Sequence, residues 1–211
     1  MKSNTVYQIK ITLNDIRPPI WRRLHVPSNC TMDALHCALQ MAMGWMDGHL
    51  YAFRTKKRWV EIPDPDAMDD AGFGLSSRPK PEDSAKVQLC ELAKPGETIM
   101  YDYDFGDGWV HTIRIEKAVE ADDISARKAV CLKGKRACPP EDCGGPWGYQ
   151  YMLETLAMPD LERDEEAQEL MEWIDDDWDA EAFDLEDTNA GLSSWKPNQH
   201  SCMYEANWGE E

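Results

Sequence analysis

Four side chains near residue 105 have the residue types of a metal-binding or acid–base site. Asp102 and Asp104 alternate along an expected strand, and Asp107 and His111 follow them closely. Carboxylate oxygens are the ligands that Mg²⁺ and Mn²⁺ prefer, so this spacing predicts a magnesium or manganese site or a pair of catalytic carboxylates. The alternative is a structural hairpin in which Asp107 shapes the turn and His111 lies in the core.

A second group of acids lies in a loop rich in proline and glycine. Glu141 and Asp142 follow two prolines and precede a cysteine and two glycines, a pattern that presents both carboxylates at the tip of a loop. Either side chain could act as a general base or as a metal ligand. Alternatively, the two acids cap the following helix or pair with Arg22, Arg23 or Arg136.

The cysteines of the same region offer sulfur ligands. Cys131, Cys138 and Cys143 could hold zinc, with His200 or Cys202 as the fourth ligand. No close Cys-x2-Cys pair is present, so buried free thiols are the alternative. Zinc, magnesium and manganese are therefore the cofactors that the residue types suggest.

Basic and aromatic side chains are interleaved in the first sixty residues. This arrangement could contact phosphates and stack bases, so it predicts a surface for nucleic acid or for an acidic protein partner. The net charge of −18 disfavours nucleic acid. In the alternative, the patch docks the acidic segment 160–187 of the same chain. The patch consists of Arg17, Arg22, Arg23, Arg54, Lys56, Lys57 and Arg58, with Trp21 and Trp59.

Two segments, 97–105 and 109–117, predict a β-hairpin that would position the aspartates. A three-residue loop at 106–108 places the apolar and aromatic side chains on one face, together with His111. The opposite face then carries Asp102 and Asp104 side by side. In this register the opposed pairs are Phe105 with Trp109, Tyr103 with His111, Tyr101 with Ile113, and Ile99 with Ile115.

The other elements follow from apolar periodicity. Residues 63–83 and 131–148 lack a period and are expected to be loops. His36 and His49 are expected to have structural roles. The fold class is α+β, a largely antiparallel sheet with helices packed on one face, plus an acidic C-terminal helical segment. Strands are expected at 6–13, 20–26, 49–54 and 58–62, and helices at 31–43, 86–92, 149–157 and 165–174.

Length and charge bound the organisation of the chain. Its 211 residues are enough for one buried core, and no apolar run approaches the roughly 18–20 residues that span a bilayer. Residues 1–60 carry nine Lys/Arg against three Asp, a net of +6, whereas 160–187 carry one Arg against fifteen acids, a net of −14. We expect a core over 1–158, an acidic helical extension packed on it over 159–192, and a flexible tail over 193–211.

Cysteine usage and the N-terminus indicate a compartment. Seven cysteines at irregular spacing favour reduced thiols, and the chain enters a strand pattern directly without a signal peptide. We therefore expect a cytoplasmic protein with no membrane association.

Several motifs in order resemble those of the plasmid pRiA4b ORF-3-like family, whose members are also labelled as passengers of insertion sequences. The resemblance covers about 6–192 and implies an α+β fold, but no activity and no catalytic residues. The resolvase label attached to the family is an association, because no recombinase serine site or helix-turn-helix is evident. The motifs are Ile-Arg-Pro-Pro-Ile-Trp-Arg-Arg at 16–23, Met-Gly-Trp at 43–45 with His-Leu at 49–50, Tyr-Asp-Tyr-Asp-Phe-Gly-Asp at 101–107, and Cys-Pro-Pro-Glu-Asp-Cys-Gly-Gly at 138–145.

Three functional hypotheses follow. The first is a non-enzymatic binding or adaptor protein associated with mobile elements and acting through a protein partner, because no catalytic signature is present. The second is a metal-dependent hydrolase or nuclease that uses Asp102, Asp104, Glu141 and Asp142, which requires the 138–145 loop to fold over the acidic face of the hairpin. The third is nucleic-acid binding through the basic patch.

Overall fold

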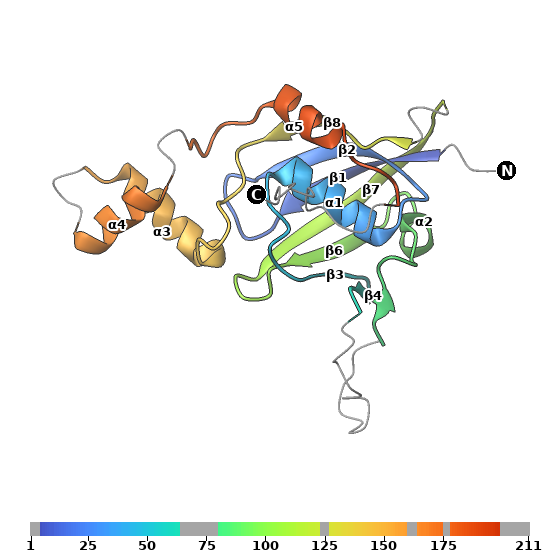
Figure 1. Cartoon of the computed structure of the whole chain (residues 1–211), viewed down its shortest axis with the longest axis horizontal. Helices are drawn as coiled ribbons and strands as arrows, with labels where there is room; N and C mark the ends of the chain where they lie inside the picture. Colours follow the sequence, from blue (N-terminus) through green and yellow to red (C-terminus); the bar gives the residue numbers. More distant parts are fainter. Residues whose placement is uncertain (1–4, 64–79, 123–126, 160–163, 175–177, 199–211) are drawn as a thin grey trace, which may run out of the picture.

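The segments that carry the candidate acids lie at the same end of a broad sheet (Figure 1). A computed structural model describes residues 5–63, 80–122, 127–159, 164–174 and 178–198. Most of the expected loop over 63–83 therefore lies outside the described residues. The elements are β1 (Thr5–Leu13), β2 (Trp21–Pro27), α1 (Met32–Met43), β3 (Tyr51–Arg54), β4 (Trp59–Glu61), β5 (Glu82–Asp83), α2 (Leu89–Leu92), β6 (Thr98–Tyr103), β7 (Trp109–Glu120), β8 (Val130–Lys135), α3 (Gly145–Ala157), α4 (Glu165–Trp173) and α5 (Leu185–Leu192).

Within the described residues, the strands form one sheet in the order β5-β4-β3-β6-β7-β1-β2-β8. All neighbours are antiparallel except β4 and β5. Ile9, Ile11 and Leu13 of β1 are buried, as the alternating pattern predicts, while the residues between them are half-exposed. The α+β fold class is therefore confirmed.

Helix α1 lies across one face of the sheet (Figure 1). It begins after Thr31 and ends at Gly44, whose φ of 93° lets its N–H bond the carbonyl of Gln40 at 2.8 Å. Nearly every residue of α1 is buried. An apolar stripe that packs only on the sheet would leave the opposite side of the helix exposed, so a second element must cover that side. The C-terminal segment covers the other side of the helix, where buried Trp195 donates from Nε1 to the carbonyl of Ala34 at 2.6 Å.

The contact of Trp195 bears on the expected tail. Residues 193–198, the described part of that tail, pack on α1 instead of extending away from it. Residues 199–211 lie outside the described residues, and the division at 158 and 192 stays a prediction. None of the described helices is long and apolar enough to cross a membrane.

The hairpin of β6 and β7 has a different register from the expected one. Tyr103 pairs with Trp109 and Tyr101 with His111, so the loop has five residues, 104–108, instead of three. The shift is two residues, which preserves the faces of the strands, and the buried aromatic face is as predicted. Phe105 leaves this face and is 54% exposed.

Strand β8 is the main element that the sequence did not predict. It pairs with β2 at the edge of the sheet and occupies the start of the segment expected to be a loop. Its alternation of apolar and polar side chains is weak, because the apolar Val130 and Leu132 lie on the exposed face and are each 38% exposed.

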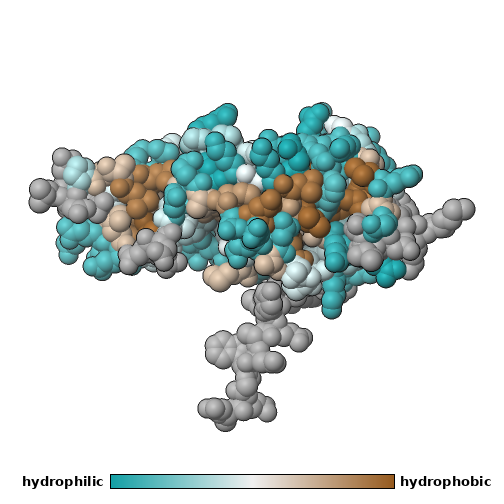
Figure 2. Space-filling model, turned by 90° about the horizontal axis from the view of Figure 1, so that it is seen from above, coloured by the Kyte–Doolittle hydropathy of each residue, from teal (hydrophilic) through white to brown (hydrophobic). Residues whose placement is uncertain are grey.

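Seen from above, apolar surface forms a band along the long axis of the molecule (Figure 2).

The thiols only partly follow the expectation. Cys30, Cys90, Cys131, Cys138 and Cys143 are free. Cys37 is disulfide-bonded, so the expectation of reduced thiols is wrong at this position.

We expect His111 to make the protein sensitive to acid. The residue is fully buried, and burial lowers the pKa of its imidazole from 6.5 to about 3. Between these values the unfolded chain binds a proton that the folded chain does not. The free energy of unfolding therefore falls as the pH drops below 6.5, by about 1.4 kcal/mol per pH unit for this group. In urea titrations from pH 7 to 4, His111→Phe should show a shallower decline than the unsubstituted protein, and an equal decline would contradict this assignment.

Candidate metal centre

Three connections converge at the end of the sheet. They are residues 44–50 between α1 and β3, residues 104–108 in the β6–β7 turn, and residues 136–144 between β8 and α3. The 138–145 loop contacts the hairpin at its turn, where the N–H of Gly144 donates to the carboxylate of Asp107 at 3.2 Å, and the hydrolase hypothesis itself stays a prediction.

Asp104 builds the hairpin turn and offers one free carboxylate oxygen to the site. Its φ of 51° lies in the left-handed region, which aspartate tolerates better than most residues. Its Oδ1 accepts the N–H of Gly106 at 2.9 Å and that of Asp107 at 3.3 Å. The turn thus holds a buried carboxylate in one orientation, with Oδ2 directed toward His49.

The 138–145 loop is fixed by bonds from both neighbouring connections. Trp45 donates from Nε1 to the carbonyl of Pro139 at 2.9 Å. Glu141 accepts the backbone N–H of Met46 at 3.2 Å and the hydroxyl of Tyr103. Burial, reinforced by the Glu141 carboxylate, raises the pKa of Tyr103 well above its usual value, so the hydroxyl stays a donor.

Two glycines permit close backbone contacts at this loop. A Cβ at Gly145 would overlap the backbone carbonyl of Asp107 in the hairpin turn, and one at Gly148 in the first turn of α3 would overlap the carbonyl of Cys143 in the loop itself. The carboxylate of Asp107 also accepts the N–H of Gly144 at 3.2 Å. The two glycines therefore allow contacts between backbones that any larger residue would prevent.

A polar network beneath the site holds the 44–50 connection. His36 lies 2.6 Å from Asp47 through Nε2 and 2.7 Å from the hydroxyl of Tyr101 through Nδ1. Gln40 donates to the same hydroxyl at 2.9 Å and accepts the N–H of Asp47 at 3.0 Å. Burial lowers the pKa of His36, and the neutral ring then bridges α1, the connection and β6.

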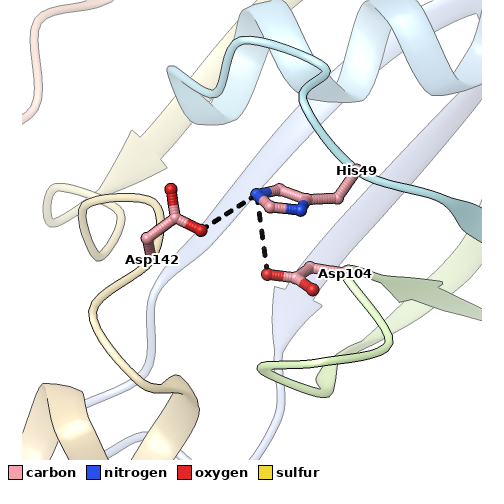
Figure 3. Close-up of side chains that lie close together, drawn as sticks. All are labelled: His49, Asp104 and Asp142. Atoms are coloured by element: carbon pink, nitrogen blue, oxygen red, sulfur yellow. Dashed lines mark ion pairs between the residues drawn. The ribbon is translucent and has the colours of Figure 1, made fainter.

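The outcome is a compact group of three ligand atoms. His49 Nε2 lies 3.2 Å from Asp142 Oδ1 and 3.7 Å from Asp104 Oδ2, and all three atoms lie within 4.8 Å of one another. Figure 3 shows both carboxylates directed at the same ring nitrogen. One ring nitrogen carries at most one proton, so it cannot hydrogen-bond both carboxylates well at once.

The 3.2 Å separation of His49 Nε2 and Asp142 Oδ1 suits a shared metal ion, whereas the 3.7 Å separation of His49 Nε2 and Asp104 Oδ2 would have to shorten when the ion binds. Bonds of about 2.1 Å at angles of about 90–110° place neighbouring ligand atoms about 3.0–3.4 Å apart. Asp104 is buried, His49 is half-buried, and Asp142 is exposed, so one side of the group opens to solvent. Three ligands on one side leave coordination positions for water or substrate on the other.

The structure separates the remaining predicted acids from this group. Asp102 does not share a face with Asp104, because the turn begins at Asp104, and its carboxylate pairs with Arg54 at 2.9 Å. His111 is buried in the core, where its Nδ1 faces the carbonyl of Tyr101 at 3.3 Å. Asp107 and Glu141 hold the loop to the hairpin instead of completing the group.

The three cysteines do not converge. Among the described residues, the group with three ligand atoms within 4.8 Å is the His49 group alone. Cys138 contacts the sulfur of Met43 at 3.6 Å, and burial raises the pKa values of Cys138 and Cys143 to about 12 each. Burial therefore favours the thiol form at Cys138 and Cys143, and the zinc site made by Cys131, Cys138 and Cys143 stays a prediction that the geometry of the described residues does not support. His200 and Cys202, the expected fourth ligands, lie outside the described residues.

The basic patch is also not a free surface. Arg22 is 3% exposed and donates to the carbonyls of Ala42 and Lys135. Arg23 pairs with Glu116 at 2.8 Å and Arg58 with Glu82 at 2.7 Å, while Arg17 and Lys57 are exposed. The arginines do pair internally, but within the described residues their carboxylate partners come from nearby strands and not from 160–187. Arg22 does stack on Phe183 of that acidic segment, 4.5 Å from its ring centroid.

His49 is the member of this group that sequence reasoning did not predict. The sequence places it at the start of a strand, which predicts a structural role. The available signal was its place in the Met-Gly-Trp and His-Leu motif, beside the two motifs that carry Asp104 and Asp142. Only the meeting of the three connections shows that the motifs form one site.

Comparison with other proteins agrees with the motif pattern. An uncharacterised protein of Sinorhizobium fredii, y4hQ, is 37% identical over 194 residues, which cover 89% of this chain and 91% of that protein. The crystal structure of MM3350, a protein of unknown function from Methanosarcina mazei, is 32% identical with a TM-score of 0.71 and covers 87% of this chain and 97% of that one. Residues 5–187 match the family described as plasmid pRiA4b ORF-3-like protein, and the chain belongs to this family.

Proposed function

We propose that this protein binds one divalent metal ion through His49, Asp104 and Asp142 and uses it for a hydrolytic reaction. The observation that carries the proposal is the convergence of one imidazole nitrogen and two carboxylate oxygens within 4.8 Å. A mixed nitrogen and oxygen set suits Mn²⁺ or Zn²⁺ better than an all-oxygen ion such as Mg²⁺. A water molecule bound at an open position is the nucleophile that such an ion supplies.

The charge around the site favours a hydrolase whose substrate is not a nucleic acid over a nuclease. Residues 44–50, 104–108 and 137–148 contain no Lys or Arg but contain five acids. A polyanionic backbone would meet repulsion there, because the nearest arginines in the hollows offset little of this charge: Arg54 already pairs with Asp102 and Arg22 is buried. The cytoplasmic location and the association with mobile elements stay predictions.

Titration of the metal-stripped protein with Mn²⁺, followed by calorimetry, tests the proposal. We expect one ion per chain and, for Asp142→Asn, an affinity weaker by about tenfold, because one exposed ligand loses its charge. Asp102→Asn is the matched control, since Asp102 is a carboxylate of the same hairpin that pairs with Arg54. Absence of saturable binding, or an equal loss in the control, would refute the metal site.

A further inference from the structure

Large apolar side chains surround the metal centre on the outside of the molecule. They are Met46, Leu50, Phe105 and Trp147, with exposed fractions of 78%, 61%, 54% and 88%. Single exposed apolar residues are common on protein surfaces and need no explanation. Here, however, all four belong to the three segments that build the site or to the first turn of α3 directly after them.

Each metal ligand also lines a separate hollow that contains one of these side chains. His49 and Leu50 line a hollow of about 320 Å³, and Asp104 and Phe105 line one of about 400 Å³. Asp142 shares a groove of about 700 Å³ with Met46. The ligands therefore stand where three concave surfaces meet, each with an apolar side chain at its border.

The apolar character of the largest groove continues away from the site. Its walls include Trp45 from the connection after α1, and Trp173, Trp178 and Phe183 from the C-terminal segment. Grooves of about 300–1,000 Å³ with apolar walls and a few polar groups are typical of binding sites. An extended ligand could thus contact the metal centre at one end and apolar walls at the other.

The charge of this surface selects the ligand. Residues 44–50, 104–108 and 137–148 carry five acids and no Lys or Arg, so a bound divalent ion would still leave these residues a net charge of −3. Nucleic acids and other polyanions are repelled by such a surface. A second copy of this chain, with net charge −18, is disfavoured for the same reason.

We infer that this surface binds a polypeptide segment that carries both basic and large apolar side chains. Apolar side chains of the segment occupy the three hollows, and its basic side chains face the carboxylates. The inference goes beyond the proposed metal chemistry and does not depend on it, because the apolar border and the charge are present without an ion. If the metal centre is hydrolytic, such a segment is its substrate.

Fluorescence anisotropy with labelled peptides tests the surface. The probes are a peptide of about fifteen alternating leucines and lysines, the same peptide with glutamates, and a single-stranded oligonucleotide. We expect saturable binding of the leucine–lysine peptide alone, weakened about tenfold or more in the double variant Met46→Ser, Trp147→Ser. Both replaced side chains are highly exposed, so the variant should fold normally.

A matched variant distinguishes this surface from general attraction to an acidic protein. Val130→Ser with Leu132→Ser removes two side chains of β8, each 38% exposed and neither lining the three hollows, and should leave peptide affinity unchanged. Equal loss in both double variants, or equal binding of the glutamate peptide or the oligonucleotide, would overturn the inference. So would self-association that Met46→Ser, Trp147→Ser abolishes, since a second copy would then be the occupant. Each titration is run once with EDTA and once with Mn²⁺, so that failure of the proposed metal site can be distinguished from failure of the proposed peptide surface.

Discussion

Asp104→Asn should weaken Mn²⁺ binding on the order of a hundredfold, equivalent to about 2.7 kcal/mol, without unfolding the protein. The asparagine oxygen can still accept the N–H groups of Gly106 and Asp107, so the turn keeps its shape. What the substitution removes is the negative charge of a buried ligand. The expected effect is larger than that of Asp142→Asn, because Asp104 is 7% exposed and water cannot readily take its place.

Comparison with Asp104→Ala separates the two roles of this residue. Alanine loses the metal ligand and also both turn bonds, so the free energy of unfolding should fall by a further 1–3 kcal/mol or so relative to asparagine. Calorimetric metal titration and urea unfolding of both variants give the two quantities independently. If Asp104→Asn binds Mn²⁺ as tightly as the unsubstituted protein, Asp104 serves only the turn.

Arg22→Ala should destabilise the protein by about 3 kcal/mol or more, because its guanidinium is buried and satisfied by backbone carbonyls. The side chain bonds Ala42 at the end of α1, Trp21 of its own strand, and Lys135 of β8. Alanine would leave these acceptors without their donor in the interior. Lysine should not rescue the loss, because an ammonium group lacks the planar fork that reaches several acceptors.

Arg23→Ala is the matched control for this prediction. Arg23 is the next residue along β2, points to the opposite face and pairs with Glu116, and its side chain is 31% exposed. Exposed pairs contribute about 0–1 kcal/mol, so its loss should be small. Urea unfolding of both variants at neutral pH checks the difference. Equal losses in the free energy of unfolding would mean that the bonds from Arg22 to backbone carbonyls stabilise the fold no more than the Arg23–Glu116 ion pair does.

In the β6–β7 hairpin, the alternation of apolar side chains predicted the buried face but not the register. Alternation of side chains identified the buried face of β6 and β7 correctly although the register was displaced, since a shift of two residues returns every side chain to its own face. The displacement itself arises at Asp104, where side-chain bonds to Gly106 and Asp107 end the strand early. Local bonds of this kind compete with the strand ladder and are not visible in a hydrophobic period.

Strand β8 and Arg22 show where the pattern gave no answer. The sequence of β8 does not alternate cleanly, because Val130 and Leu132 are apolar although their face of the strand is exposed, so its segment resembles a loop. Arg22 belongs by charge to a surface patch, yet it lies on the buried face of β2 because the carbonyls around it replace its hydration.

For the site, the sequence alone identified the acidic residues of two motifs. It also indicated a turn, although at 106–108 instead of 104–108, and a loop rich in proline and glycine at 138–145. Which of these residues meet could be learned only from the fold. Asp104, Asp142 and His49 are distant in sequence and come together because α1, the hairpin and the 136–144 connection end at the same side of the sheet. Asp102 and Asp104 are two residues apart and separate because the chain leaves the strand between them. Distance along the chain therefore says little about this group, whose three side chains are positioned by where the strands and the helix end.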